Sequence, residues 1–280
     1  MSLQDSIETQ VSTALKEDIG SGDLTAALIP AERHGQASVI TREAMVLCGQ
    51  PWVDAVFRQL DPKVRVDWRL HEGMLAEPLQ TLFSIDGTAS ALLTGERTAL
   101  NFLQTLSATA TQTRRFVDAI RGTNAVIVDT RKTLPGLRLA QKYAVKIGGG
   151  TNHRIGLYDG VLIKENHIMA AGGVKQALGI AQKNTPAGVP IQIEVETLDQ
   201  LRDALDAGGK MILLDNFDLE RMREAVTLNA GRAKLEGSGG VNLDTVRAIA
   251  ETGVDRISIG ALTKDIRAID LSMRFALDGK

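Results

Sequence analysis

Cysteine is almost missing from this sequence. Cys48 is the only one among 280 residues, so no disulfide can form within the chain. With one cysteine and four histidines, a cysteine-rich structural zinc site is excluded as well. No apolar run approaches the roughly 18 residues that a membrane-spanning helix needs. The first residues are polar and include acids, unlike a secretion signal. We therefore expect a cytoplasmic protein with no membrane contact.

A strong excess of positive charge is also lacking. The formal net charge is -2, which argues against the chain as a whole being a nucleic-acid binder. Hydrophobic residues make up 44% and charged residues 24%, as in ordinary globular proteins. A chain of this length predicts one large domain or two moderate ones.

The first part of the chain mixes helix and strand patterns. Apolar residues at helical spacing over 7–19 predict an amphipathic helix, and alternation over 64–70 predicts a strand with one wet face. Residues 37–41 and 79–85 are further strand candidates. A long helical stretch follows over 89–120, with an expected break at 106–110, where small residues and threonines collect. We therefore predict an α+β domain over 1–107.

The second part has a regular rhythm of short apolar strands. They begin at Ala125, Val161, Ile191, Met211, Ala233 and Arg256. Helical patterns separate most of them, for example over 198–207 and 243–251. Continuous apolar strands alternating with helices predict a parallel sheet buried on both faces. Because no dinucleotide fingerprint or Walker lysine loop is present, an α/β barrel over 108–264 is favoured over an open sheet. A C-terminal helix over 265–280 is expected and could join the first domain.

Each apolar strand turns polar at its C-terminal end, which is the rim where α/β barrels build active sites. The polar residues at these ends are Asp129, Arg131, Lys132, Lys164, Glu194, Asp215, Glu236, Ser238 and Ser258. Six such endings in succession predict a ring of functional groups around one opening.

The charge along this rim is uneven. Between Asp129 and Lys164 there are seven basic residues against two acids, the acids being Asp129 and Asp159. The basic residues are Arg131, Lys132, Arg138, Lys142, Lys146, Arg154 and Lys164. Such a bias concentrates anions, and guanidinium groups suit carboxylates and phosphates. The later acids Glu194 and Asp215 suit ribose hydroxyls, Mg²⁺ or positive charge developing on a sugar.

Two glycine-bearing turns follow the last two strands, Ser238-Gly239-Gly240 and Ser258-Ile259-Gly260. Late loops of an α/β barrel commonly hold a phosphate with backbone N–H groups. Together with the basic rim, these turns predict a sugar-phosphate substrate and a second, anionic partner.

Residues 129–167, DTRKTLPGLRLAQKYAVKIGGGTNHRIGLYDGVLIKENH, closely resemble the quinolinate phosphoribosyltransferase family, also called carboxylating nicotinate-nucleotide pyrophosphorylase. So do GERTALNFLQ from Gly95, IEVET from Ile193, LLDNF from Leu213 and EGSGG from Glu236. The resemblance implies a type II phosphoribosyltransferase fold, with an N-terminal α+β sandwich and a C-terminal α/β barrel. It further implies a homodimer that uses phosphoribosyl pyrophosphate (PRPP) with Mg²⁺ and no organic cofactor. The implied reaction joins quinolinate to PRPP, releasing pyrophosphate and CO2, in NAD biosynthesis.

The resemblance also assigns roles to residues of this chain. The family's quinolinate-binding residues match Arg97, Arg131, His153, Arg154 and Lys164. Arg97 matches an arginine that the neighbouring subunit supplies. Lys132 matches a lysine near the pyrophosphate leaving group, and Glu194 and Asp215 match acids that meet the ribose and its metal. With Lys164, these last three are the implied catalytic residues. The two glycine turns match the site of the 5-phosphate.

Plainer interpretations stay open for single residues. Arg97 could be an ordinary solvated helix residue, and Lys164 could form a structural ion pair with Glu194 or Asp215.

Other functions also stay open. A Schiff-base aldolase would use Lys164 as its nucleophile. A phosphoribosyltransferase of the same fold would accept another anion, such as nicotinate or a molybdenum-associated ligand. A phosphometabolite sensor or scaffold would bind without turnover. The RK, HR and KENH motifs together favour a substrate with two carboxylates.

Overall fold

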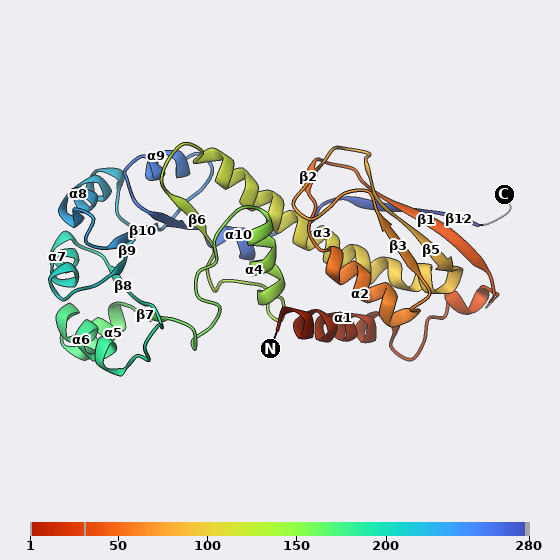
Figure 1. Ribbon diagram of the computed structural model, residues 1–280, viewed down its shortest axis with the longest axis horizontal. Coiled ribbons are helices and arrows are strands. Elements are labelled where there is room, and N and C mark those ends of the chain that lie inside the picture. The colour runs from red at the N-terminus through yellow and green to blue at the C-terminus, as the bar shows by residue number, and fades with distance from the viewer. Residues whose placement is uncertain (1, 31, 278–280) are drawn as a thin grey trace. The chain divides into compact units, whose positions relative to one another are not determined.

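The computed structural model describes residues 2–30 and 32–277. Residue contacts divide the chain into two compact units, and each is described by itself (Figure 1). The first comprises Met1–Gln112, Leu134–Gly149 and Asp265–Lys280, and the second comprises Thr113–Thr133 and Gly150–Lys264. Among the described residues, no helix is both long and apolar enough to span a bilayer.

A four-stranded antiparallel sheet forms the centre of the first unit. Its order is β12-β1-β5-β3, and the strands are β1 (His34–Thr41), β3 (Arg65–Trp68), β5 (Thr81–Thr88) and β12 (Leu271–Leu277). The short strands β2 (Met45–Val46) and β4 (Leu75–Ala76) pair separately. The three strands expected in this part of the chain are confirmed, with ends shifted by a few residues.

Helices supply the rest of this core. They are α1 (Leu3–Ile19), η1 (Ala26–Leu28), α2 (Gln50–Leu60), α3 (Ala89–Ala119) and α4 (Arg138–Ile147). The Ser2 and Asp5 side chains form a capping box that starts α1, and Ile7, Val11 and Leu15 bury its predicted apolar face. The fully buried Trp52 and Phe57 of α2 join the same core. The expected α+β character of the first domain is therefore confirmed.

Two expectations about helices are wrong. Helix α3 is continuous through residues 106–110. The hydroxyls of Thr109 and Thr111 donate to backbone carbonyls one turn earlier, and the hydroxyl of Ser107 donates to a carbonyl outside the helix, so none of them disrupts the helical hydrogen bonds. Thr111 Oγ1 donates to the Ser107 carbonyl at 2.6 Å, and Ser107 Oγ donates to the Cys48 carbonyl at 3.0 Å.

The expected C-terminal helix is instead strand β12. Leu271, Met273 and Phe275 alternate along it and pack on the core, which is the period of a strand. The last three residues of the expected helix, 278–280, lie outside the described residues.

The charge count along the sequence also needs correction. Arg138, Lys142 and Lys146 lie on α4, which belongs to the first unit, and Lys142 is only 1% exposed. Their nearness in sequence to the rim residues therefore does not make them part of the second unit's rim.

The second unit contains six parallel strands in the order β6-β11-β10-β9-β8-β7. They are β6 (Val126–Val128), β7 (Val161–Ile163), β8 (Ile191–Val195), β9 (Met211–Asp215), β10 (Lys234–Ser238) and β11 (Arg256–Ser258). The helices are α5 (Glu165–Ala171), α6 (Val174–Asn184), α7 (Leu198–Asp206), α8 (Leu219–Asn229), α9 (Val246–Ala250) and α10 (Ala261–Lys264).

The parallel α/β arrangement confirms the predicted fold class. Within residues 2–30 and 32–277, no ladder joins β6 to β7, so the barrel is open between these two strands. Because the strands are parallel, their carboxyl ends share one edge.

The close packing of α3 on α2 can be tested at Gly95. A Cβ at Gly95 would lie 2.7 Å from Cε1 of the buried Phe57 ring and 2.9 Å from Leu60 Cδ1. Gly95→Ala should therefore destabilise the first unit by about 1–3 kcal/mol through overpacking. Thermal melting followed by circular dichroism, and by the fluorescence of Trp52 and Trp68, would measure the loss.

Gly179→Ala in α6 is the matched control, because nothing lies within 4 Å of its would-be Cβ. It should stabilise by about 0.5–1 kcal/mol, as alanine normally does in a helix. Equal effects of the two substitutions would contradict the packing argument.

Candidate active site

The strand ends of the second unit bring together the predicted rim residues. Arg131 and Lys132 follow β6, Lys164 directly follows β7, and Glu194 lies in β8. Asp215 and Ser238 are the last residues of β9 and β10 and are register partners. Residues that are far apart in sequence therefore meet at one edge of the sheet.

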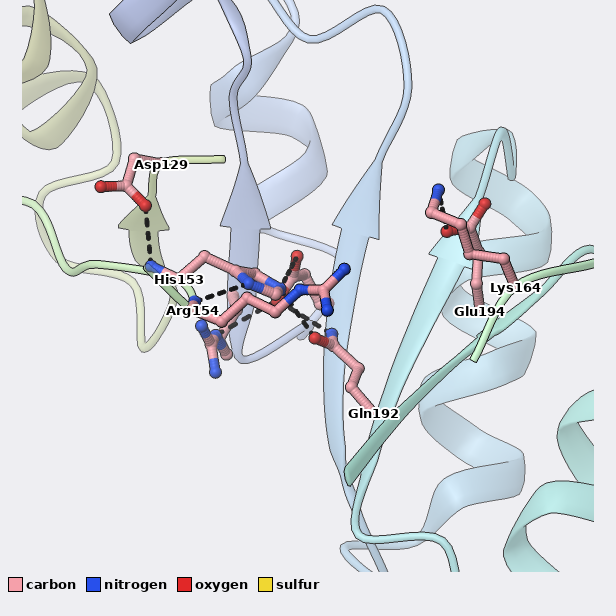
Figure 2. Close-up of polar contacts among 8 residues, drawn as sticks. Asp129, His153, Arg154, Lys164, Gln192 and Glu194 are labelled. Atoms are coloured by element: carbon pink, nitrogen blue, oxygen red, sulfur yellow. Dashed lines mark hydrogen bonds and ion pairs between the residues drawn. The ribbon is translucent and has the colours of Figure 1, made fainter. Parts of the chain in front are cut away.

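An ion pair joins two neighbouring strand ends. Lys164 Nζ lies 3.0 Å from Glu194 Oε2, and Figure 2 shows the two side chains against each other. The Lys164 side chain is 52% exposed, whereas that of Glu194 is only 15% exposed. The ion pair considered from the sequence therefore exists, and its lysine end stays open to solvent.

Asp215 is electrostatically coupled to this pair. Burial raises the pKa of Asp215, and the nearby Glu194 carboxylate raises it further, while the Lys164 and Lys132 ammonium groups oppose the shift. The charges of Glu194, Lys164 and Lys132, each from a different strand end, thus act on Asp215. Such a mixed cluster can balance charge that appears during a reaction.

Two threonine hydroxyls hold the backbone of Lys132 in place. Its N–H donates to Thr130 Oγ1 at 3.1 Å, and its carbonyl accepts from Thr263 Oγ1 at 2.8 Å. Its side chain runs along Gly260, where a Cβ would lie 3.3 Å from Lys132 Cδ. The Lys132 side chain therefore packs against the glycine turn that follows β11.

Two guanidinium groups form the basic part of the site. Burial lowers the pKa of Arg154, and the positive charge of Arg131 lowers it further. Arg154 Nη1 donates to the Gly160 carbonyl at 3.1 Å, which fixes the side chain. An anion placed between the two arginines would relieve their repulsion, so this pair is a good site for carboxylates.

His153 has a different environment from the one expected. Its backbone N–H donates to Asp129 Oδ1 at 2.8 Å, and its ring Nε2 lies 2.8 Å from Gln192 Oε1 (Figure 2). Its ring Nδ1 accepts the backbone N–H of Arg154 at 2.8 Å. Both ring nitrogens are therefore engaged within the protein in this conformation, and the contact of His153 with quinolinate stays a prediction.

The first glycine turn requires its glycines. Gly239 and Gly240 have φ values of +108° and +59°, and a Cβ at Gly239 would collide with Asn216 Oδ1. The Asn216 amide also donates to Asp215 Oδ2 at 3.0 Å. Asn216 therefore contacts both this turn and Asp215, the acid at the end of the neighbouring strand.

The second turn differs from the prediction. Ile259 is 1% exposed, and its N–H donates to the Val128 carbonyl at 3.0 Å. This N–H therefore belongs to the sheet and is not a phosphate donor here. Ser258 is also buried, at 6% exposure.

Arg97 belongs to the first unit, on α3, and its side chain is exposed. Among residues 2–30 and 32–277, it has no hydrogen bond or ion pair.

Three polar residues inside the second unit were missed as site residues. Gln192, Glu236 and Arg256 form a chain from His153 into the sheet. The signal was available for Gln192, because it shares a strand face with Glu194 within an otherwise apolar strand.

In the part of the chain that the structure describes, no group of three or more histidine, cysteine or acidic side chains could hold a metal ion by itself. A cation bound by Glu194 and Asp215 would therefore need further ligands from a substrate.

Comparisons with known proteins agree with this geometry. Residues 23–107 and 109–274 match the N-terminal and C-terminal domains of quinolinate phosphoribosyl transferase. A Mycobacterium leprae protein called nicotinate-nucleotide pyrophosphorylase (carboxylating) is 41% identical over 279 residues, covering 96% of this chain and 97% of its own. A Bacillus subtilis protein, called a probable enzyme of the same name, is 39% identical over 264 residues, covering 94% and 91%.

The solved structure of nicotinate-nucleotide pyrophosphorylase from Francisella tularensis is 44% identical to this chain. It superposes with a TM-score of 0.95 over 99% of this chain and 98% of its own. The two proteins therefore share their fold over nearly their whole length, and the chain belongs to the quinolinate phosphoribosyltransferase family.

Proposed function

We propose that this enzyme converts quinolinate and PRPP to nicotinate mononucleotide, pyrophosphate and CO2, a step of de novo NAD biosynthesis. The observation that carries the proposal is the coupled guanidinium pair, Arg131 and Arg154, on the same rim as the acids Glu194 and Asp215. Two adjacent cations suit a substrate with two carboxylates, and the acids suit a ribose. The family membership supports the same reaction.

In the first step, the quinolinate ring nitrogen attacks the anomeric carbon of PRPP while the bond to pyrophosphate breaks. Positive charge develops on the ribose ring, where Glu194 and Asp215 stabilise it. Negative charge develops on the leaving group, where Lys132 neutralises it. Binding two polyanions side by side is otherwise opposed by their repulsion, so positioning and charge balance are the main contributions of the protein.

In the second step, the ribosylated nitrogen draws electrons from the pyridinium ring, and the carboxylate at C2 leaves as CO2. The electron pair of the broken bond stays at C2, which then takes up a proton to give nicotinate mononucleotide. Lys164, with its exposed ammonium 3.0 Å from Glu194, is suited to stabilise that negative charge.

We include Mg²⁺ in this proposal. Glu194 and Asp215 would hold it together with PRPP oxygens, since Mg²⁺ usually combines one or two carboxylates with substrate phosphates. Burial raises the pKa of Asp215 and the negative charge of Glu194 raises it further, which supports a role for the two acids as joint ligands of a cation. When bound, the ion supplies positive charge to the pyrophosphate.

The homodimer belongs to the same proposal. An arginine that is exposed and has no partner within the described residues is suited to act in a neighbouring subunit, so we propose that Arg97 reaches the partner's quinolinate. A cytoplasmic location stays a prediction, because related plant proteins are named chloroplastic or mitochondrial.

The Schiff-base alternative is disfavoured by the ion pair of Lys164 with Glu194, because that pairing stabilises the charged ammonium and a Schiff base requires the neutral amine. The sensor alternative gives no reason for coupled acids and bases on one rim.

The reaction itself can be tested with purified protein, PRPP and Mg²⁺. Quinolinate as the acceptor should release CO2 and form mononucleotide in equal amounts, whereas nicotinate should give no product because it has only one carboxylate for the two arginines. The measurements are trapping of labelled CO2 and chromatography of the nucleotide.

Turnover of nicotinate instead of quinolinate would overturn the choice of substrate. A borohydride-trapped adduct of Lys164 with a ketose phosphate would support the aldolase.

Arg131→Ala should lower kcat/KM for quinolinate by about 100-fold, the cost of a charge-assisted bidentate contact. The fold should survive, because Arg131 lies on a loop. Steady-state kinetics with either substrate varied would measure the effect. Arg223→Ala, at an exposed position of α8, is the control. A near-normal kcat/KM for the Arg131 variant would remove this residue from the site.

The coupling of the acids predicts opposite pKa changes. Glu194→Gln removes a neighbouring negative charge, so the pKa of Asp215 should fall relative to the unmodified enzyme. Lys164→Met removes a positive charge, so the same pKa should rise. Carboxyl ¹³C shifts of Asp215 followed against pH, without substrates, would measure both.

Glu196→Gln serves as the control for this titration, since Glu196 is exposed and lies two residues away along the chain. Shifts of the Asp215 pKa in the same direction for both site variants would contradict the coupling.

A further inference from the structure

A chain of polar side chains runs through the interior of the second unit, beneath His153. Gln192 of β8 and Glu236 of β10 are 3% and 1% exposed, and Arg256 begins β11. His153 Nε2 lies 2.8 Å from Gln192 Oε1, and Gln192 Nε2 donates to Glu236 Oε2 at 3.1 Å. Arg256 Nε lies 3.3 Å from the same Glu236 oxygen. Burying polar and charged side chains costs free energy of folding unless they are hydrogen-bonded or paired, so a functional role for this arrangement is worth examining.

The hydrogen bonds fix the protonation of the His153 ring. The backbone N–H of Arg154 points at Nδ1 from 2.8 Å, so Nδ1 must be an acceptor and cannot carry a proton. The proton of the neutral ring is therefore on Nε2, which donates to Gln192 Oε1. An imidazolium would place two donors against each other at Nδ1.

Glu236 fixes the orientation of the Gln192 side-chain amide. An ionised carboxylate only accepts hydrogen bonds, so the Gln192 amide must turn its nitrogen toward Glu236 and its oxygen toward His153. Turning the amide over would oppose two oxygens at one end and two N–H groups at the other. The buried charge of Glu236 is in turn balanced by Arg256.

We propose that Gln192 and Glu236 are positioning residues for the anionic substrate: they hold His153 as the neutral Nε2–H tautomer, and His153 then holds the Arg154 backbone. The guanidinium of Arg154 is thereby kept beside that of Arg131. This inference rests on the proposed function only in naming the substrate. The tautomer itself is a property of the protein without substrates.

The tautomer is the first measurement. Long-range ¹H–¹⁵N spectra of the full-length protein near neutral pH should show His153 protonated at Nε2 and unprotonated at Nδ1. Only four histidines contribute signals, and His153→Gln identifies the relevant one by its loss. An imidazolium or an Nδ1–H tautomer in the unmodified protein would overturn the inference, whatever substrate the enzyme uses.

The second measurement uses a variant in which the series of hydrogen-bonded side chains is broken at Gln192. Gln192→Leu keeps the approximate volume but breaks both hydrogen bonds, so only the Arg154 N–H still holds the ring and the single-tautomer signature should weaken. The KM for quinolinate should rise on the order of tenfold, the size of effect seen when a metal-ligating histidine loses its orienting hydrogen-bond partner, with kcat and the KM for PRPP nearly unchanged. Gln36→Leu is the matched control, because Gln36 makes the same kind of bond, to Asp86 Oδ2 at 3.1 Å, on the exposed sheet of the first unit.

Glu236→Gln serves if Gln192→Leu does not fold. It keeps the shape of the side chain but can donate as well as accept, so the Gln192 amide is no longer held in one direction and the tautomer signature should become mixed. An unchanged tautomer in both variants, or a quinolinate KM that moves no more than in Gln36→Leu, would overturn the inference. Absence of quinolinate turnover in the unmodified enzyme with the predicted tautomer intact would instead count against the proposed function alone.

Discussion

Repulsion between like charges, held in place by the fold, is the constraint on which the candidate site depends. Burial lowers the pKa of Arg154, and the positive charge of Arg131 lowers it further. Burial likewise raises the pKa of Asp215, and the negative charge of Glu194 raises it further. A folded chain keeps such groups together only where other contacts compensate. The opposed pairs then favour ligands that carry the missing charge, anions for the arginines and a cation or developing cation for the acids.

The contacts that offset this repulsion lie at two levels of the second unit, at the rim of the parallel sheet and in its interior. At the rim, Lys164 pairs with Glu194, and Asn216 donates to the Asp215 carboxylate. Below the rim, the Glu236 carboxylate is buried and anchors a line of donors and acceptors that ends at the His153 ring. The rim can exchange its partners with substrate because it is exposed, whereas the deeper line cannot, and this difference separates residues that bind from residues that position.

Period and composition predicted much of the fold. Apolar strands separated by helices predicted the parallel sheet, and polar endings predicted which edge carries chemistry, because a strand's period and direction are local properties. The misjudged elements involve partners far along the chain. Ser107 stays helical while bonding Cys48, and β12 is a strand because it pairs with β1 across the length of the protein. Ile259 was predicted to offer its N–H to a phosphate, but this N–H donates to the carbonyl of Val128.

The sequence by itself determined the inventory of the site: which cations, acids and glycine turns stand at strand ends, and the family to which their motifs point. Only the tertiary structure decided which of these side chains contact one another. It placed Arg138, Lys142 and Lys146 on a helix of the first unit despite their nearness to Arg131 in sequence, and it turned His153 inward toward Gln192. The physical reason is that hydrogen bonds and charge coupling depend on distances of a few ångströms, which sequence spacing does not specify once the chain folds back on itself.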